Sequence, residues 1–294
     1  MAFSAFFRFI KNLRYLSKYN LKDFNTFLEN LDNYTQCVKY QTKADWENIV
    51  TPKIKDNFST LYELVNTEKS LIRIGDGEFT LIEGRDIPFQ SYDKRLAHGL
   101  IEILKSNYNN LLVALGWEYF HINSDLRDFA KQAAYIGIPS LYKTIEENID
   151  PQKVYYSTAI SQIYATYKQY DFEKHFSLMR QIWKNKSVTI ICGDRVFNNI
   201  KYNIFDNAKD VSYIYGPTMH AYKDFDILKE KIMQVSKNNI LIFALGPCGK
   251  LLAYEMYKQG YRVLDLGHSI KDYNEYKNNT KMTRKEIVKF LKPD

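Results

Sequence analysis

Short runs of apolar, often β-branched residues alternate along the chain with stretches of helical spacing, and this alternation is the strongest constraint on the fold. The clearest runs cover residues 188–192 and 239–244, and others cover residues 71–74, 110–115, 154–156, 211–215 and 262–265. Helices are predicted for residues 57–65, 95–105 and 251–258. Strands that alternate with helices of about ten residues predict an α/β, Rossmann-like fold, in which helices cover both faces of a mostly parallel sheet.

The composition and charge of the chain narrow its class and its partners. Of the 294 residues, 45% are apolar and 26% are charged, as in ordinary globular proteins. The net charge of +7 suits an anionic partner, and a phosphorylated cofactor, a membrane surface and nucleic acid are all of this kind. No nucleic-acid recognition motif is present, so a nucleic-acid partner is not expected. No run of about 18 apolar residues and no secretory signal is found, and we expect a cytoplasmic location.

The first fifty residues differ from the rest and are predicted to form a helical segment, followed by one domain over residues 51–294. Apolar residues recur at helical spacing from Phe3 to Leu16, interleaved with Arg8, Lys11, Arg14 and Lys18. Such a basic amphipathic helix more often packs on its own domain or on a second subunit of an oligomer. The alternative is a peripheral contact with the inner face of the membrane.

Polar or glycine-rich segments follow four of the predicted strands. They are residues 75–78 (Gly-Asp-Gly-Glu), 193–195 (Gly-Asp-Arg), 245–247 (Leu-Gly-Pro) and 265–268 (Asp-Leu-Gly-His). Ligands of open parallel sheets bind at the carboxyl ends of the strands. Because these ends share one edge of the sheet, we expect the four segments to form an active site there.

Asp76 and Glu78 lie two residues apart on a glycine turn, which lets both carboxylates enter one cleft. Carboxylate oxygens suit Mg²⁺ or Mn²⁺, and such an ion commonly joins one or two carboxylates to a diphosphate. Asp76 and Glu78 are therefore candidate metal ligands and catalytic residues. The alternative is that Asp76 only caps the helix that starts near Glu78.

The other three segments offer groups for phosphate binding and proton transfer. Gly246 and Gly249 would let backbone amides at a helix N-terminus face a phosphate. Lys250 is either a phosphate contact or, as is more common, an ordinary first-turn surface lysine. His268 could orient a phosphate or move a proton, and Asp272 could act as a general base on an acceptor hydroxyl. Next to Asp194, Arg195 could bind a phosphate with two hydrogen bonds or form a surface salt bridge.

The arrangement of these segments resembles the GT-D glycosyltransferases, a family first catalogued as a domain of unknown function. The family pattern R-x-G-D-G-E matches Arg73–Glu78, and C-G, N-x-F-D-N-A, A-L-G-P and D-x-G-H match residues 192–193, 203–208, 244–247 and 265–268. The similarity runs in the expected order from about residue 55 to 280. Two departures stand out: Asp272 replaces a glutamate, and residues 220–222 (His-Ala-Tyr) replace N-A-F.

The resemblance implies a Rossmann-like fold, a UDP-sugar donor (often UDP-glucose) and a divalent metal, Mn²⁺ or Mg²⁺, held by the D-x-E pair Asp76 and Glu78. Carried over by position, the donor site would include Arg73, Gly75, Gly77, Asp194, Arg195, Gly246, Pro247 and His268. We therefore expect transfer of a hexose, with glucose favoured, to a hydroxyl of a glycan or glycoprotein acceptor. The alternatives are a nucleotide-sugar hydrolase or phosphotransferase, and a non-catalytic nucleotide-binding subunit.

Overall fold

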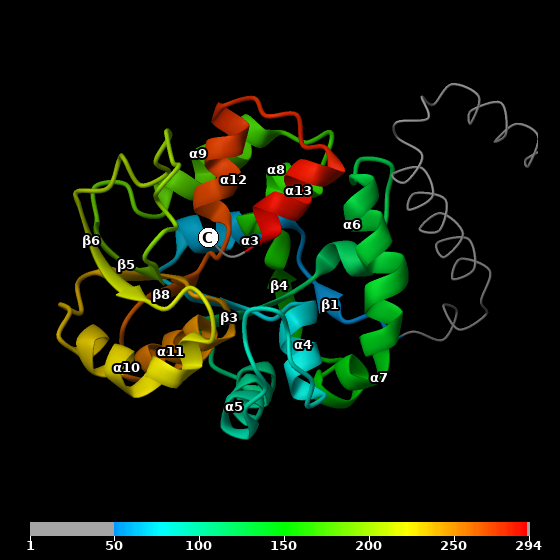
Figure 1. The fold of residues 1–294 in the computed structure, drawn as a ribbon, viewed down its shortest axis with the longest axis horizontal. Coiled ribbons are helices and arrows are strands. Elements are labelled where there is room, and N and C mark those ends of the chain that lie inside the picture. The colour runs from blue at the N-terminus through cyan, green and yellow to red at the C-terminus, as the bar shows by residue number, and fades with distance from the viewer. Residues whose placement is uncertain (1–49, 293–294) are drawn as a thin grey trace, which may run out of the picture. The chain divides into compact units, whose positions relative to one another are not determined.

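The computed structural model describes residues 50–292 of the chain. The predicted helical segment of residues 1–50 lies, except for its last residue, outside the described residues, so its packing or membrane role stays a prediction. The described part contains an eight-stranded sheet in the order β1-β4-β3-β2-β8-β7-β5-β6 (Figure 1). Every neighbouring pair of strands is parallel. The predicted α/β, Rossmann-like class with a parallel sheet is confirmed.

All seven strands that the sequence predicts are present, with ends shifted by one residue or not at all. They are β2 (Ser70–Arg73), β3 (Leu111–Leu115), β4 (Val154–Ser157), β5 (Ser187–Gly193), β6 (Asp210–Gly216), β7 (Ile240–Ala244) and β8 (Val263–Asp265). The sequence analysis missed only the edge strand β1 (Lys53–Ile54), whose two residues are too few to show a pattern.

Helices cover both faces of the sheet, as Figure 1 shows. One face carries α4 (Asp76–Ile82), α5 (Lys94–Lys105), α7 (Ile138–Asn148), α10 (Phe225–Met233) and α11 (Gly246–Lys258). The other carries α3 (Asn57–Asn66), α8 (Ile163–Thr166), α9 (Phe172–Gln181), α12 (Ser269–Lys277) and α13 (Arg284–Leu291). The short helix α6 (Asp128–Gln132) continues through a π-helical turn, Ala133–Gly137, into α7.

Two hydrophobic cores lie on the two faces of the sheet, because successive strand residues point to opposite sides. Along β7, Leu241 and Phe243 belong to one core, while Ile240 and Ile242 belong to the other. The central strands β2, β3, β5, β7 and β8 are buried on both faces, which explains why their sequences are largely continuous apolar runs. The polar residues are thereby left to the two edges of the sheet where the strands begin and end.

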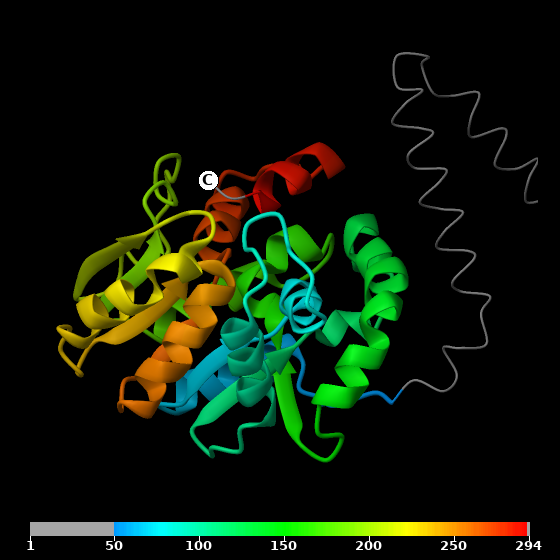
Figure 2. The same cartoon turned by 60° about the horizontal axis from the view of Figure 1, so that its bottom comes forward.

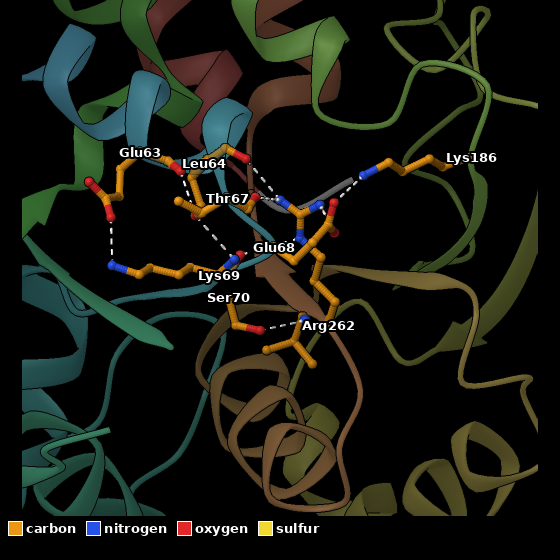
Figure 3. A network of polar contacts seen from close by, with 9 residues as sticks. Glu63, Leu64, Thr67, Glu68, Lys69, Ser70, Lys186 and Arg262 are labelled. Carbon is orange, nitrogen blue, oxygen red and sulfur yellow. Dashed lines mark hydrogen bonds and ion pairs between the residues drawn. The ribbon is translucent and has the colours of Figure 1, made fainter. Parts of the chain in front are cut away.

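At the amino edge, Arg262 fastens helix α3 to the sheet (Figure 3). Its guanidinium donates hydrogen bonds to the carbonyl oxygens of Leu64 and Thr67 at the end of α3, at 2.9 and 3.0 Å, and to that of Lys69. It also pairs with Glu68, which in turn pairs with Lys186. A helix leaves its last carbonyl oxygens without intrahelical partners, so an arginine there satisfies groups that the sequence pattern alone leaves open.

No helix within residues 50–292 has the length and apolar character needed to cross a bilayer.

Candidate functional site

A cavity of about 610 Å³ opens at the carboxyl edge of the sheet. Three of the four predicted segments line it: residues 75–78, 245–247 and, from the last segment, Asp265, Gly267 and His268. The loop of residues 86–90 and helix α13 also contribute walls, and Figure 2 shows this loop (cyan) rising beside α13 (red). The expected convergence of polar segments is therefore found for these three, while the fourth contributes Gly193 alone.

A buried cluster of two cations and two carboxylates forms part of the cavity wall. The guanidinium of Arg73 lies 3.0 Å from Asp265 Oδ1, and its Nε donates to the Asp265 carbonyl oxygen at 2.9 Å. The ammonium of Lys250 lies 3.3 Å from both Asp265 Oδ2 and Glu78 Oε1. Burial acts to raise the pKa of Asp265, but Arg73 and Lys250 outweigh it and hold the pKa below its usual range.

Gly267 makes room for this cluster. Its φ of +42° lies in the left-handed region, and a Cβ built on it would stand 2.2 Å from an Arg73 guanidinium nitrogen. Arg73 also donates to the hydroxyl of Ser161, so its side chain is held from two sides. Arg73 lines the cavity as predicted, but its hydrogen bonds go to the protein itself.

Asp76 and Glu78 differ in what surrounds them, although both line the cavity. Asp76 is the first residue of α4 and its side chain is exposed. Glu78 is buried, and its Oε2 accepts a hydrogen bond from the Gly75 amide at 2.8 Å. The cap of α4 is thus supplied by Glu78, so the alternative that Asp76 serves only as a cap is wrong.

Asp76 and Glu78 both line the cavity, and carboxylate oxygens are ligands that suit a divalent metal. Within residues 50–292, no group of three or more His, Cys, Asp or Glu side chains is arranged to hold a metal ion. Mg²⁺ is commonly held by one or two carboxylates together with substrate phosphates. Asp76 and Glu78 provide such a pair, with Oε1 of Glu78 shared with Lys250.

Helices α4, α11 and α12 begin at the cavity. Helix N-termini carry partial positive charge and unpaired amides, which favour anions. The turn into α11 depends on Gly246, whose φ of +56° disfavours any side chain, and Pro247 follows within the first helical turn. The helix starts five residues before the predicted Leu251, so Gly246 and Pro247 belong to its first turn rather than to a preceding loop.

His268 caps the start of α12 and lines the cavity. Burial, together with the nearby charges of Lys271, Arg73 and Lys250, lowers its pKa to about 3. The imidazole is therefore neutral near pH 7. It can donate a hydrogen bond to a ligand from one nitrogen and accept one at the other.

Asp272 does not line the cavity, which corrects its predicted role as general base. Its carboxylate is fully buried, and the two oxygens accept hydrogen bonds from the amides of Tyr164 and Ala165 at 2.9 Å each. Burial raises its pKa to about 7. Asp272 thus caps the N-terminus of α8, and its buried carboxylate is not available to an acceptor hydroxyl in the cavity.

Asp194 and Arg195 lie beside the main cavity rather than in it. They line a shallow neighbouring depression at the ends of β5 and β6, with about two thirds of each side chain exposed. Thr218 lines both hollows and therefore lies on the border between them. The predicted place of Asp194 in the donor site and the predicted phosphate contact of Arg195 are therefore not supported by their position.

Three charged wall residues were not among the predicted site residues: Lys250, Asp265, which was named only within its segment, and Glu118, which was not named at all. Lys250 is only 6% exposed, so its interpretation as a surface lysine is wrong. Glu118 follows β3, and its Oε1 accepts hydrogen bonds from Asn57 Nδ2 at 3.0 Å and the Tyr167 hydroxyl at 2.8 Å. Burial raises the pKa of Glu118 above its usual range. The position of Glu118 directly after a predicted strand was the one available signal.

The loop of residues 86–92 is tied to residues 220–222, where the chain departs from the family pattern. The His220 amide donates to the Phe89 carbonyl oxygen at 2.8 Å, and the Ser91 amide donates to His220 Nδ1 at 3.1 Å. The Tyr222 amide also reaches the Gln90 side chain. The departure therefore affects how a cavity wall is held.

Comparison with known proteins identifies the class that this fold and site define. Residues 71–290 match the family described as "Glycosyltransferase GT-D fold". The chain belongs to this family of glycosyltransferases, and the resemblance seen in the sequence is confirmed.

Two curated streptococcal proteins are similar to the chain. It is 28% identical over 213 residues to "Probable glycosyl transferase Gly" of Streptococcus gordonii, which spans 71% of this chain and 31% of that protein. It is 27% identical over 243 residues to "Glycosyltransferase GlyD" of Streptococcus pneumoniae serotype 4, spanning 81% of this chain and 29% of that protein. The matched region is thus under a third of each relative's length.

Solved structures agree with the fold. A glycosyltransferase of the former family DUF1792 from Streptococcus sanguinis superposes with a TM-score of 0.73 at 26% identity, covering 78% of this chain and 86% of that one. A second DUF1792 structure, described as having a distinct glycosyltransferase fold, gives a TM-score of 0.75 at 21% identity, covering 89% and 95%. At that identity the second likeness speaks for the fold alone.

Proposed function

We propose that the protein transfers a hexose, with glucose favoured, from a UDP-sugar to a hydroxyl of a glycan or glycoprotein, with the help of Mn²⁺ or Mg²⁺. The observation that carries this proposal is the composition of the cavity wall. It combines the carboxylates of Asp76 and Glu78 with the buried cations Arg73 and Lys250 and with the starts of helices α4, α11 and α12. A diphosphate with its metal ion needs both kinds of charge. The volume of about 610 Å³ is in the usual range for small-molecule sites.

We assign different parts of the donor to residues of different charge in the cavity. Asp76 and Glu78 would hold the metal ion, which supplies positive charge to the departing nucleoside diphosphate. The amides at the start of α11 and the neutral His268 offer hydrogen bonds to phosphate oxygens. Preorganised groups of this kind stabilise charge that develops in the transition state without costly rearrangement.

Glu118 is the carboxyl group that we assign to proton uptake in place of Asp272. It lines the cavity, burial raises its pKa and so makes its carboxylate a stronger base, and Asn57 and Tyr167 fix its Oε1. A positioned general base contributes roughly 100- to 10,000-fold to a rate. In Glu118→Gln we expect the slow cleavage of donor by water to fall by about 100-fold while UDP affinity stays unchanged. A loss of UDP affinity of similar size would contradict the assignment.

The proposed function is tested by measuring UDP release from a panel of UDP-sugars with Mn²⁺, with and without EDTA. Many transferases slowly hydrolyse their donor, so the acceptor need not be known. We expect one sugar to be cleaved, EDTA to stop the reaction, and Asp76→Ala to lower the rate by at least about 100-fold. Asp226→Ala is the matched control, because Asp226 is an exposed aspartate in the first turn of α10, outside the cavity.

The other outcomes distinguish the alternatives. A full rate of donor cleavage that no glycan acceptor increases would indicate a hydrolase. UDP binding in calorimetry without cleavage of any sugar, with or without acceptors, would indicate a nucleotide-binding subunit. The absence of UDP binding would refute the proposed site.

A further inference from the structure

Lys250 occupies an unusual position for a lysine in the cavity wall. It sits in the second turn of α11, and its side chain is 7% exposed. Its ammonium lies equally far, 3.3 Å, from Glu78 Oε1 and from Asp265 Oδ2. Lysine is almost never this buried without such pairing, because removing the ammonium from water is costly.

The two carboxylates do not depend on Lys250 to the same degree. Asp265 is held by Arg73 through its Oδ1, its Oδ2 and its carbonyl oxygen. Glu78 has Lys250 as its only cationic partner within residues 50–292, and its other oxygen is fixed by the Gly75 amide. The contact between Lys250 and Glu78 Oε1 is therefore the one that can change without dismantling the rest of the cluster.

From these contacts we infer that Lys250 is a donor-binding residue, which holds Glu78 Oε1 in the empty site and turns to the donor diphosphate when Glu78 binds the metal ion. The inference rests on the proposed function. An ammonium has three N–H donors, and among the described residues Lys250 has two partners, so a phosphate oxygen can be added. The flexible stem of lysine allows the shift, and its point charge is a common phosphate partner.

The charges of the site favour this exchange. Arg73 and Lys250 carry two formal positive charges, and Asp265, Glu78 and Asp76 carry three formal negative ones, so these five groups together sum to −1. A diphosphate alone would add further negative charge to a confined site. A divalent cation alone would have to compete with Lys250 for Glu78. Binding of both together satisfies every group, so metal ion and donor should bind with positive coupling.

The test is calorimetric titration of the full chain with Mn²⁺ alone, with UDP alone, and with UDP in the presence of Mn²⁺. In the wild type we expect UDP to raise the affinity for Mn²⁺ by at least about tenfold. In Lys250→Met, Mn²⁺ alone should bind about tenfold more tightly, because Glu78 is no longer occupied. UDP with Mn²⁺ should bind at least about tenfold more weakly, because a charge-assisted contact is lost.

Two control variants separate this role from a general loss of charge. Lys229→Met removes a lysine of α10 whose ammonium lies 2.9 Å from Glu255 Oε2 outside the cavity, and it should leave all affinities unchanged. Glu78→Gln keeps an oxygen for the Gly75 amide but releases Lys250. It should weaken Mn²⁺ binding and tighten metal-free UDP binding, and it tests the inference should Lys250→Met fail to fold.

The inference and the proposed function fail in different ways. If wild type binds Mn²⁺ and UDP but Lys250→Met leaves both affinities unchanged, the role of Lys250 is refuted and the proposed function stands. If Lys250→Met weakens UDP binding yet leaves Mn²⁺ binding unchanged, the exchange at Glu78 is refuted. If the wild type binds no UDP, both the inference and the proposed function are refuted.

Discussion

Strand β8 has an arginine–carboxylate cluster at each end, and the two clusters serve different purposes. At the amino edge, Arg262 pairs with Glu68, whose side chain is 72% exposed. At the carboxyl edge, Arg73 pairs with Asp265, whose side chain is 4% exposed. Exposed ion pairs contribute little to stability, whereas a buried charge is costly once its partner is removed.

The difference lies in what else each cation contacts. Arg262 donates its other hydrogen bonds to the carbonyl oxygens of Leu64, Thr67 and Lys69, at and just after the end of α3 and away from the cavity. The carboxyl-edge cluster adds Lys250 and Glu78, which line the cavity. The same type of ion pair thus holds a helix to the sheet at one end of a three-residue strand and forms part of the cavity wall at the other.

The largest expected effect is that of Asp265→Asn. It leaves the buried cations Arg73 and Lys250 with one carboxylate fewer, and we expect the free energy of unfolding to fall by about 3–5 kcal/mol. Urea denaturation followed by circular dichroism measures this. A loss below about 1 kcal/mol would mean that the two ends of β8 do not differ as proposed.

Asp272 sharpens the comparison, because it is as buried as Asp265 but has no ion pair in the described structure. Burial raises its pKa from 3.8 to about 7, so between these values the folded protein holds a proton that the unfolded chain releases. Stability should therefore fall as the pH rises from 4 to 7, by roughly 4 kcal/mol for this group.

For Asp265 the sign is opposite, because its lowered pKa makes a stabilising contribution that is lost only in acid, below its ordinary pKa of 3.8. We expect Asp272→Asn to remove the fall between pH 4 and 7, seen as the difference in unfolding free energy from wild type. A difference that is the same at pH 4, 5.5 and 7 would contradict the raised pKa.

Arg262→Met should have a smaller effect, confined to stability. The loss of hydrogen bonds to three carbonyl oxygens should lower the free energy of unfolding by about 2–3 kcal/mol. UDP affinity should remain within about twofold of wild type, since this edge is opposite the cavity. Arg262→Lys should recover part of the stability. A marked change in UDP affinity would show that the two ends of β8 are coupled.

The smallest effect is expected for Glu68→Gln, the amino-edge counterpart of Asp265→Asn. An exposed pair should cost less than about 1 kcal/mol, and the loss should shrink further in 1 M NaCl. Thermal unfolding at two salt concentrations checks this. A loss as large as that of Asp265→Asn would refute the distinction between the two clusters.

Much of the fold was readable in advance because buried strands are chemically distinctive. The apolar runs at residues 188–192 and 239–244 predict central strands, and the other five strands followed from the same pattern. Strand β1 could not be predicted, since two residues carry no periodicity. The segments at the ends of β2, β7 and β8 could be assigned to one edge because parallel strands end together.

Individual side chains of the site were harder to assign. Asp272 was expected to be a general base and Lys250 was interpreted mainly as a surface lysine, yet the first caps the start of α8 and the second pairs with two carboxylates in the cavity wall. Glu118 lies in a short 3-10 turn without a motif. Their roles depend on residues more than 60 positions away, such as Asn57 for Glu118, and no local pattern reports such contacts.

The sequence by itself determined the class of fold, the family, and the position of Asp76 and Glu78 at the edge of the sheet where the cavity lies. These follow from local patterns, since hydrophobic periodicity and glycine turns are set by neighbouring residues. Only the tertiary structure decided which charges meet: Lys250 with Glu78 and Asp265, and Asp272 with the start of α8. Burial and pairing set the energy of a charge, and both arise only when distant segments pack together.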